Sequence, residues 1–90
     1  MTLETRENKR KRLIFRSWHR GTREMDLILG AFADQYVSHF TKEELDLYQE
    51  LLTIPDPDLY DWVSGRVTVP ANSMNPLIEK LLDYYVSKNS

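Results

Sequence analysis

Apolar residues spaced three and four positions apart constrain the fold of this chain more than any other feature of its sequence. The clearest case is residues 23–40, where one helical face would carry Met25, Ile28, Leu29, Phe32, Tyr36 and Phe40. Leu27, Ala31 and Val37 widen this face, which predicts a central helix with several neighbours. Gly30 costs a helix interior about 1 kcal/mol relative to Ala, so it indicates a close crossing with another helix.

Helical patterns also occur before and after this segment. Residues 6–19 are amphipathic, and we expect Gly21 to end their helix. The apolar positions of residues 6–19 are Leu13, Ile14, Phe15 and Trp18. Thr41 and Glu44 have the spacing of a capping box, in which a hydroxyl and a carboxylate satisfy free amides at a helix start. A third helix therefore follows, with an inner face made of Leu45, Tyr48, Leu51 and Leu52.

A fourth helix is predicted over residues 56–64. Asp56 can cap it, and Pro57 suits the first helical turn. The helix would bury Leu59 and Trp62 and stop at the next glycine. Residues 66–74 then read as an extended connection, with a short edge strand as the alternative.

Asn75 and Pro76 open the last helix, whose inward positions are Leu77, Ile78, Leu81, Leu82 and Tyr85. Five short helices with short connections predict a compact all-α five-helix bundle, because the strands of parallel βαβ units are missing. We expect residues 1–90 to form a single small domain with a radius of gyration of roughly 12 Å. Residues 1–5 and 88–90 are expected to fray.

Residues that could carry chemistry are too scattered to indicate an enzyme. The chain has no cysteine, which excludes disulfides, thiolate metal sites and a cysteine nucleophile. His19 and His39 lie in different predicted helices without metal-ligand spacing, and no phosphate-binding glycine loop occurs. The apolar runs fall far short of the ~20 residues that cross a bilayer, and no signal-type segment follows the basic N-terminus. We expect a soluble protein without membrane insertion, metal site or secretion signal.

Charge is distributed unevenly along the chain, although the net charge is only -2. Residues 1–23 carry eight Lys or Arg against two Glu, whereas residues 24–90 carry four basic against twelve acidic residues. The acidic remainder would repel a phosphate backbone, so we expect no nucleic-acid partner. A small adaptor that binds nucleic acid through the basic helix over residues 6–16 is the alternative function.

Residues 20–24, Arg-Gly-Thr-Arg-Glu, separate the first two predicted helices and have two interpretations. In the first, Gly21 is a left-handed helix end or the cap of the second helix, with Glu24 bonding back to a free amide. In the second, a residue without Cβ lets a partner approach closely, while Arg20 and Arg23 offer donor forks and Glu24 an acceptor. The two interpretations are compatible.

Motifs in a specific order cover most of the chain, from about Arg10 to Tyr85. They are Arg10-Lys11-Arg12-Leu13, Arg20-Gly21-x-Arg23-Glu24-x-Asp26, the Phe32 helix, Leu51-Leu52 and Asp56-x-Asp58-Leu59-x-x-Trp62. This order resembles the succinate dehydrogenase flavinylation factor family, called SdhE in bacteria and found also in mitochondria. The resemblance implies a five-helix bundle that binds the flavoprotein subunit of succinate dehydrogenase or fumarate reductase. It implies no catalysis by this chain, which would promote the partner's autocatalytic covalent attachment of FAD.

The resemblance also implies a partner-binding surface. Its signature would be Arg20, Gly21 and Glu24, its flank Arg23, Met25 and Asp26, and its extension along the first helix Arg12 and Arg16. We expect a monomer without a stably bound cofactor, located in the cytoplasm of a bacterium or the mitochondrial matrix of a eukaryote. The sequence departs from the family at Thr22, where Met is common, and in the long connection over residues 66–74.

Overall fold

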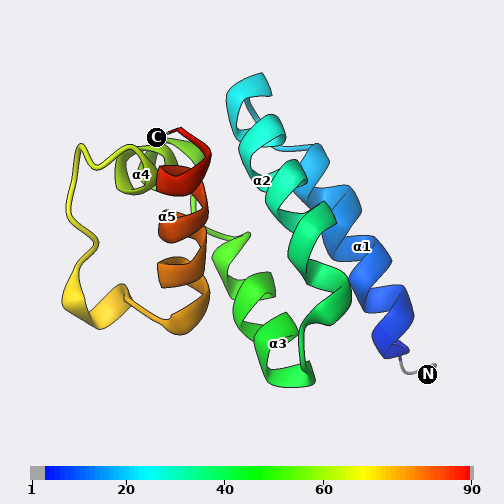
Figure 1. Ribbon diagram of the computed structural model, residues 1–90. Helices are drawn as coiled ribbons and strands as arrows, with labels where there is room; N and C mark the ends of the chain where they lie inside the picture. Colours follow the sequence, from blue (N-terminus) through cyan, green and yellow to red (C-terminus); the bar gives the residue numbers. More distant parts are fainter. Residues whose placement is uncertain (1–3, 90) are drawn as a thin grey trace.

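The computed structural model describes residues 4–89, and within them it contains five α-helices, two short 3₁₀ helices and no strand (Figure 1). The α-helices are α1 (Arg6–Trp18), α2 (Arg23–Tyr36), α3 (Lys42–Leu51), α4 (Asp56–Val63) and α5 (Pro76–Lys88), and the 3₁₀ helices are η1 (Val37–His39) and η2 (Ala71–Ser73). The radius of gyration is 12.9 Å. The prediction of a compact all-α five-helix bundle is confirmed.

Helices α1 and α2 lie side by side as an antiparallel pair (Figure 1), α3 contacts α1, and α5 contacts α2, α3 and α4. The close crossing predicted from Gly30 is present, because the indole ring of Trp18 packs directly on it. A Cβ atom at Gly30 would lie only 2.2 Å from a Trp18 ring carbon. Trp18 Nε1 also donates a hydrogen bond to Asp34 Oδ1 at 3.2 Å, which fixes the ring in this position.

The core is built from the predicted inner faces of all five α-helices. Phe32 is fully buried at its centre, with its ring 5.1 to 6.3 Å from four other aromatic rings, those of Tyr36, Phe40, Tyr48 and Tyr84. One polar pair is buried between α1 and α3: Ser17 Oγ and Tyr48 Oη lie 2.5 Å apart, and Ser17 donates to Leu13 O. Burial raises the pKa of the Tyr48 phenol.

Two apolar positions are less buried than we expected from the sequence. Leu27, which we placed on the widened inner face of α2, has 54% of its surface exposed. Trp62 is only half-buried, and Val63 takes the inner position that we expected Trp62 to occupy beside Leu59.

The starts of α3 and α5 follow their predicted caps. Thr41 and Glu44 form the capping box of α3, and the Asn75 side chain accepts hydrogen bonds from two amides of α5. At α4, however, Pro55 occupies the N-cap position and makes no side-chain cap bond. The prediction that Asp56 caps α4 is wrong, because Asp56 is the first helical residue and its carboxylate bonds elsewhere.

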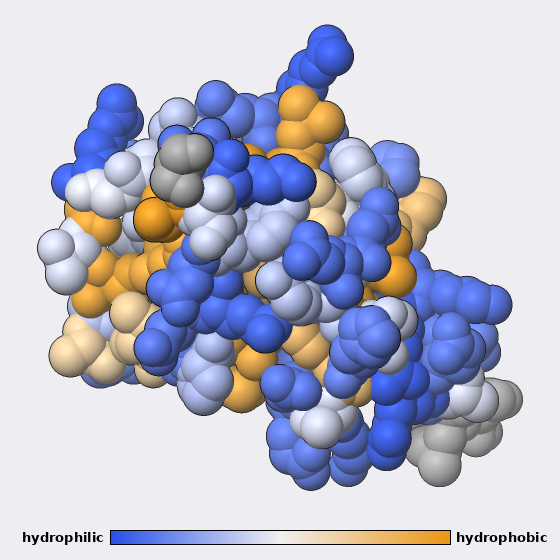
Figure 2. All heavy atoms as spheres, in the orientation of Figure 1, coloured by the Kyte–Doolittle hydropathy of each residue, from blue (hydrophilic) through white to orange (hydrophobic). Residues whose placement is uncertain are grey.

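The segment between α4 and α5 is an extended connection that contains η2, so the alternative of a short edge strand is wrong for these described residues. Gly65 begins it with a left-handed backbone, φ 80°. Of the ends that we expected to fray, residues 1–3 and 90 lie outside the described part, whereas Thr5 caps α1 and Lys88 is the last residue of α5. Hydrophilic residues cover most of the face in Figure 2, and hydrophobic atoms reach the surface there in separate places.

Candidate functional site

The corner, which we define as residues 19–22, joins α1 to α2 at the position of the Arg-Gly-x-x-Glu motif. Helix α1 ends at Trp18, and Thr22 caps α2 by accepting a hydrogen bond from Met25 N at 3.2 Å. Gly21 is neither left-handed nor a cap, since Gly65 is the glycine with positive φ among residues 4–89. Both capping interpretations of Gly21 are therefore wrong, and a different contact must explain why a glycine stands there.

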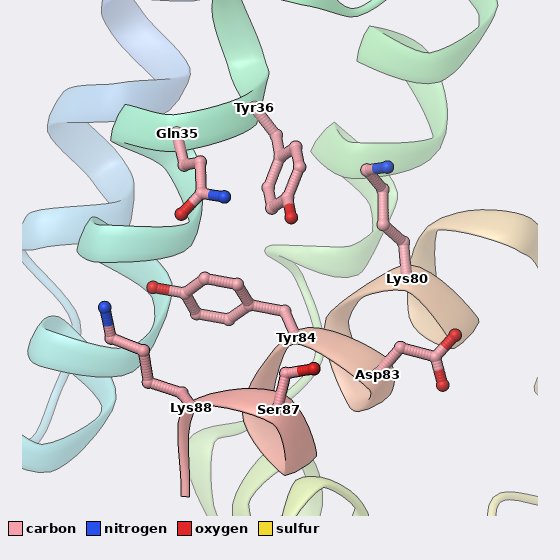
Figure 3. A pocket seen from close by; sticks show the side chains of 7 residues that line it. All are labelled: Gln35, Tyr36, Lys80, Asp83, Tyr84, Ser87 and Lys88. Carbon is pink, nitrogen blue, oxygen red and sulfur yellow. The ribbon is translucent and has the colours of Figure 1, made fainter.

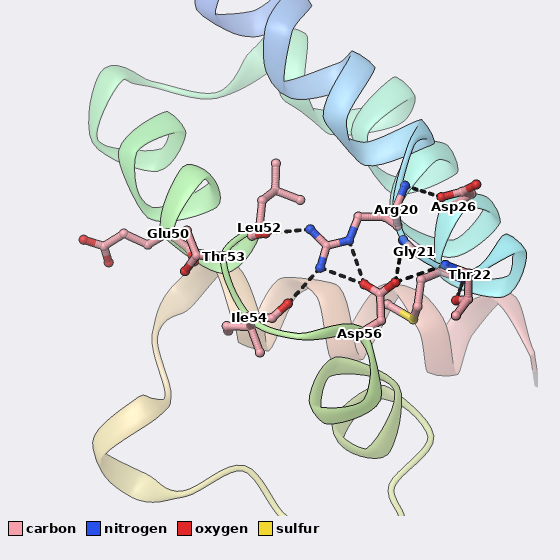
Figure 4. A network of polar contacts seen from close by, with 10 residues as sticks. Arg20, Gly21, Thr22, Asp26, Glu50, Leu52, Thr53, Ile54 and Asp56 are labelled. Carbon is pink, nitrogen blue, oxygen red and sulfur yellow. Dashed lines mark hydrogen bonds and ion pairs between the residues drawn. The ribbon is translucent and has the colours of Figure 1, made fainter.

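Arg20 turns inward and ties the corner to the loop between α3 and α4 (Figure 4). Its side chain is only 11% exposed. Nη1 donates to Leu52 O at 2.6 Å and Nη2 donates to Ile54 O at 2.8 Å, while Nε donates to Asp56 Oδ1 at 2.8 Å. The guanidinium fork thus satisfies two loop carbonyls and one carboxylate, in a geometry that only Arg can supply.

Asp56 completes the tie from the other side. Its Oδ1 atom pairs with Arg20, and its Oδ2 atom accepts hydrogen bonds from Gly21 N at 2.9 Å and Thr22 N at 3.2 Å. A Cβ atom at Gly21 would lie 3.2 Å from Asp56 Oδ2, closer than most side-chain contacts allow. The approach of the Asp56 carboxylate, and not the backbone angles, is therefore what crowds a side chain at position 21.

The remaining predicted site residues divide into an inward and an outward set. Met25 is 1% exposed and belongs to the core, and the Asp26 carboxylate accepts a hydrogen bond from the Arg20 amide. Arg23 and Glu24 lie on the solvent side of the first turn of α2, and neither side chain has a hydrogen bond or ion pair within residues 4–89. Charged groups that are exposed without an internal partner are the ones available to another protein.

A shallow hollow lies at the corner and collects several of these residues. Its lining is Arg16, His19, Arg20, Gly21, Thr22, Asp56 and Pro57. Three of the lining residues, Arg16, Arg20 and Gly21, were predicted as site residues from the sequence. Asp56 and Pro57 were expected to start α4, and Asp56 also belongs to the motifs that carry the family resemblance. Nothing local in the sequence indicated that the Asp56 carboxylate binds the Gly21 amide, 35 positions away.

Comparison with known proteins identifies the family of this chain. The family model described as "Flavinator of succinate dehydrogenase" matches residues 11–85. The chain belongs to this family. The match includes both the corner and the α3–α4 loop to which Arg20 is hydrogen-bonded.

Curated relatives of this flavinator family come from bacteria and mitochondria. The FAD assembly factor SdhE of Acetobacter pasteurianus is 37% identical over 75 residues, which are 83% of this chain and 69% of that protein. The mitochondrial succinate dehydrogenase assembly factor 2 of Scheffersomyces stipitis is 44% identical over 85 residues, covering 94% of this chain and 54% of that protein. Its counterpart from Debaryomyces hansenii is 44% identical over 84 residues, with shares of 90% and 59%. The chain thus spans little more than half the length of these mitochondrial relatives.

Thr22, where the resemblance led us to expect Met, has a structural role in this chain. Its hydroxyl caps α2 and its amide binds Asp56. A side chain that caps a helix satisfies one of the free amides that the helix start would otherwise expose. The position therefore contributes to the shape of the corner, while the side chain itself is exposed.

Arg12 and Arg16, the predicted extension along α1, have different surroundings. Arg12 donates two hydrogen bonds to the Glu4 carboxylate, at 2.7 and 2.8 Å, and one to Gln49. These bonds lower the pKa of Glu4 and raise that of Arg12. Arg16 has no such partner in the described part of the chain and lines the hollow. Of the two, Arg16 is the cation without an ion pair in the described part of the chain.

Phe15 is a surface residue that the sequence analysis did not recognise as part of a site. Its side chain is 62% exposed, and its ring stacks on the His19 ring with centroids 4.0 Å apart. On an α-helix, Arg12, Phe15, Arg16 and His19 share one face, because they are three and four positions apart. That spacing was the available signal, but an apolar residue in an amphipathic helix is usually assigned to the core.

A second surface groove lies about 20 Å from the corner along α2, at 1.5 Å per residue, and is lined by residues of α2 and α5 (Figure 3). Lys80 lies over the Tyr36 ring at 4.4 Å, and the Tyr36 and Tyr84 rings meet edge to face at 5.9 Å. These contacts join the two helices.

The described residues 4–89 contain no group of three His, Cys, Asp or Glu that could hold a metal ion. No helix in this part of the chain is long and apolar enough to span a membrane.

Proposed function

We propose that this protein is an assembly factor that binds the flavoprotein subunit of succinate dehydrogenase and promotes the covalent attachment of FAD to that subunit. The observation that carries the proposal is the family match over residues 11–85, together with an Arg-Gly-x-x-Glu motif that forms an exposed corner. The names of the bacterial and mitochondrial relatives support it. The flavoprotein subunit of fumarate reductase is the alternative partner in this proposal.

The proposed binding surface consists of the exposed face of α1, the corner and the first turn of α2. Phe15 supplies an apolar anchor, since exposed aromatic residues contribute much of the binding energy of protein interfaces. Arg16 and Arg23 are cations for acidic groups of the partner, and Glu24 is an acceptor for a basic group. This surface combines both signs of charge with one exposed aromatic ring, which favours a single docking orientation.

The chain acts in this proposal by positioning and not by chemistry of its own. The new bond joins FAD to a histidine of the partner, so this protein need only favour the partner conformation in which the two are aligned. A binder shifts such an equilibrium only as far as it prefers one conformation over the other. A corner held rigidly by Arg20 and Asp56 suits that task, because it cannot adapt to both conformations. No stably bound cofactor is required in this chain.

The test is a flavinylation assay with purified components. Apo-flavoprotein subunit and FAD are mixed with increasing concentrations of this protein, and covalent flavin is followed by in-gel fluorescence. We expect the rate of covalent attachment to rise with concentration until the partner is saturated, and this protein alone should not become fluorescent. If the rate stays unchanged while a complex with the subunit is verified by size-exclusion chromatography, the chain is an interaction module without the proposed activity. The cellular location, bacterial cytoplasm or mitochondrial matrix, follows from where this partner resides.

A further inference from the structure

We infer that Asp56 is a positioning residue of the proposed binding surface, and that Arg20 of the motif supports partner binding through Asp56 and not by touching the partner. This inference rests on the proposed function. It is carried by the bonds of one carboxylate, which joins the Arg20 guanidinium to the amides of Gly21 and Thr22. Asp56 thereby connects the start of α4 to the corner between α1 and α2.

Arg20 has little bonding capacity left for a partner. A guanidinium has five N–H donors, and its Nε, Nη1 and Nη2 atoms already donate to Asp56 and to the carbonyls of Leu52 and Ile54. The side chains of Arg20 and Asp56 are both 11% exposed. A partner that bound Arg20 directly would first have to break charge-assisted hydrogen bonds in a poorly solvated place, where such bonds are strongest.

The exposed residues that follow Arg20 are the groups that a partner can reach, and hydrogen bonds to Asp56 fix the position of their backbone. Gly21, Thr22, Arg23 and Glu24 are consecutive and exposed, and two of their four amides are bound to Asp56 Oδ2. Without this carboxylate the corner would have more conformations to lose on binding. Ordering backbone at an interface reduces affinity, so a corner that is already ordered binds more tightly.

The deciding experiment is a double-mutant cycle of Asp56→Ala and Arg20→Ala. Affinity for the apo-flavoprotein subunit is measured by calorimetry, at a temperature where melting curves show every variant folded. We expect each single substitution to weaken binding roughly tenfold or more. The double variant should have about the same affinity as the single variant that binds less tightly, because the losses from two residues that act as one unit do not add. Additive losses would show that Arg20 contacts the partner independently, which would overturn the inference.

A matched control separates positioning from general stability. Thr41→Ala removes the hydroxyl of the α3 capping box, so it should lower the melting temperature while leaving affinity unchanged. If Thr41→Ala weakens binding as much as Asp56→Ala does, stability alone explains the effect and the positioning role of Asp56 is wrong.

Amide hydrogen exchange tests the ordering without any partner. In Asp56→Ala the Gly21 and Thr22 amides should exchange at least tenfold faster, whereas the Leu77 amide, which is held by Asn75, should not change. Unchanged exchange at the corner would overturn the inference even if binding were lost. If the unmodified protein does not bind the subunit at all, the proposed function fails together with the partner role of Asp56, and the exchange result still decides whether Asp56 orders the corner.

Discussion

Substitution of Gly21 separates the shape of the corner from the stability of the fold. The Gly21 backbone is not left-handed, so an L side chain meets no strain from the backbone angles. The obstacle is the Asp56 carboxylate, whose Oδ2 atom would lie 3.2 Å from a new Cβ atom. In Gly21→Ala the carboxylate must retreat by a few tenths of an ångström, and in Gly21→Val two further methyl groups crowd the same place.

The cost to folding can be estimated from the contacts affected. Hydrogen bonds that involve a charged group contribute about 1.5 to 3 kcal/mol each, and the Gly21 and Thr22 amides would lose part of two such bonds. Replacing Gly by Ala restores about 0.4 to 1 kcal/mol by restricting the unfolded chain. We therefore expect Gly21→Ala to cost less than about 2 kcal/mol of the free energy of unfolding, which leaves the bundle folded.

Binding should respond more than folding does. The new side chain both displaces the Asp56 carboxylate and occupies the exposed surface. Affinity for the apo-flavoprotein should therefore fall about tenfold in Gly21→Ala and about a hundredfold in Gly21→Val, where each tenfold change in affinity corresponds to about 1.4 kcal/mol of binding free energy. Melting curves and calorimetry measure the two effects separately. Gly65→Ala is the matched control, because Gly65 is left-handed with open space around it. It should destabilise the fold by about 1 kcal/mol without changing affinity. If Gly21→Val unfolds the bundle while its folded fraction binds normally, our explanation of this glycine is wrong.

Two further predictions distinguish the core from the proposed surface. Phe32→Ala should cost roughly 3 to 5 kcal/mol of the free energy of unfolding, because a fully buried aromatic ring is lost. Glu24→Ala should cost far less and should slow flavinylation. If the two variants lose the same melting temperature, Glu24 is a structural residue. Phe15→Ala should leave the melting temperature within a few degrees of the original and weaken binding to the flavoprotein at least tenfold, since its ring is 62% exposed. Unchanged binding would remove α1 from the proposed surface. Val86→Ala, which alters another exposed apolar residue, is the control.

Much of the fold could be predicted from the sequence because its causes are local. The capping box of Thr41 and Glu44 and the Asn75 cap join groups no more than three residues apart. The inner faces of the helices follow from the helical repeat, which places residues three and four positions apart on the same side. Even the packing of Trp18 on Gly30 was signalled, since a glycine inside a helix is unfavourable unless something requires its small size.

The composition of the corner was decided by tertiary structure. The sequence marked residues 20–24 as unusual, but it did not distinguish the inward Arg20 and Asp26 from the outward Arg23 and Glu24. That division depends on Asp56, which lies 35 and 34 residues from the amides that it binds and looked locally like a helix cap. A carboxylate beside Pro57 has the same local pattern whether it caps its own helix or reaches another one. Only the placement of the start of α4 beside the corner determines which amides lie within reach of Asp56, because hydrogen bonds require both partners within about 3 Å.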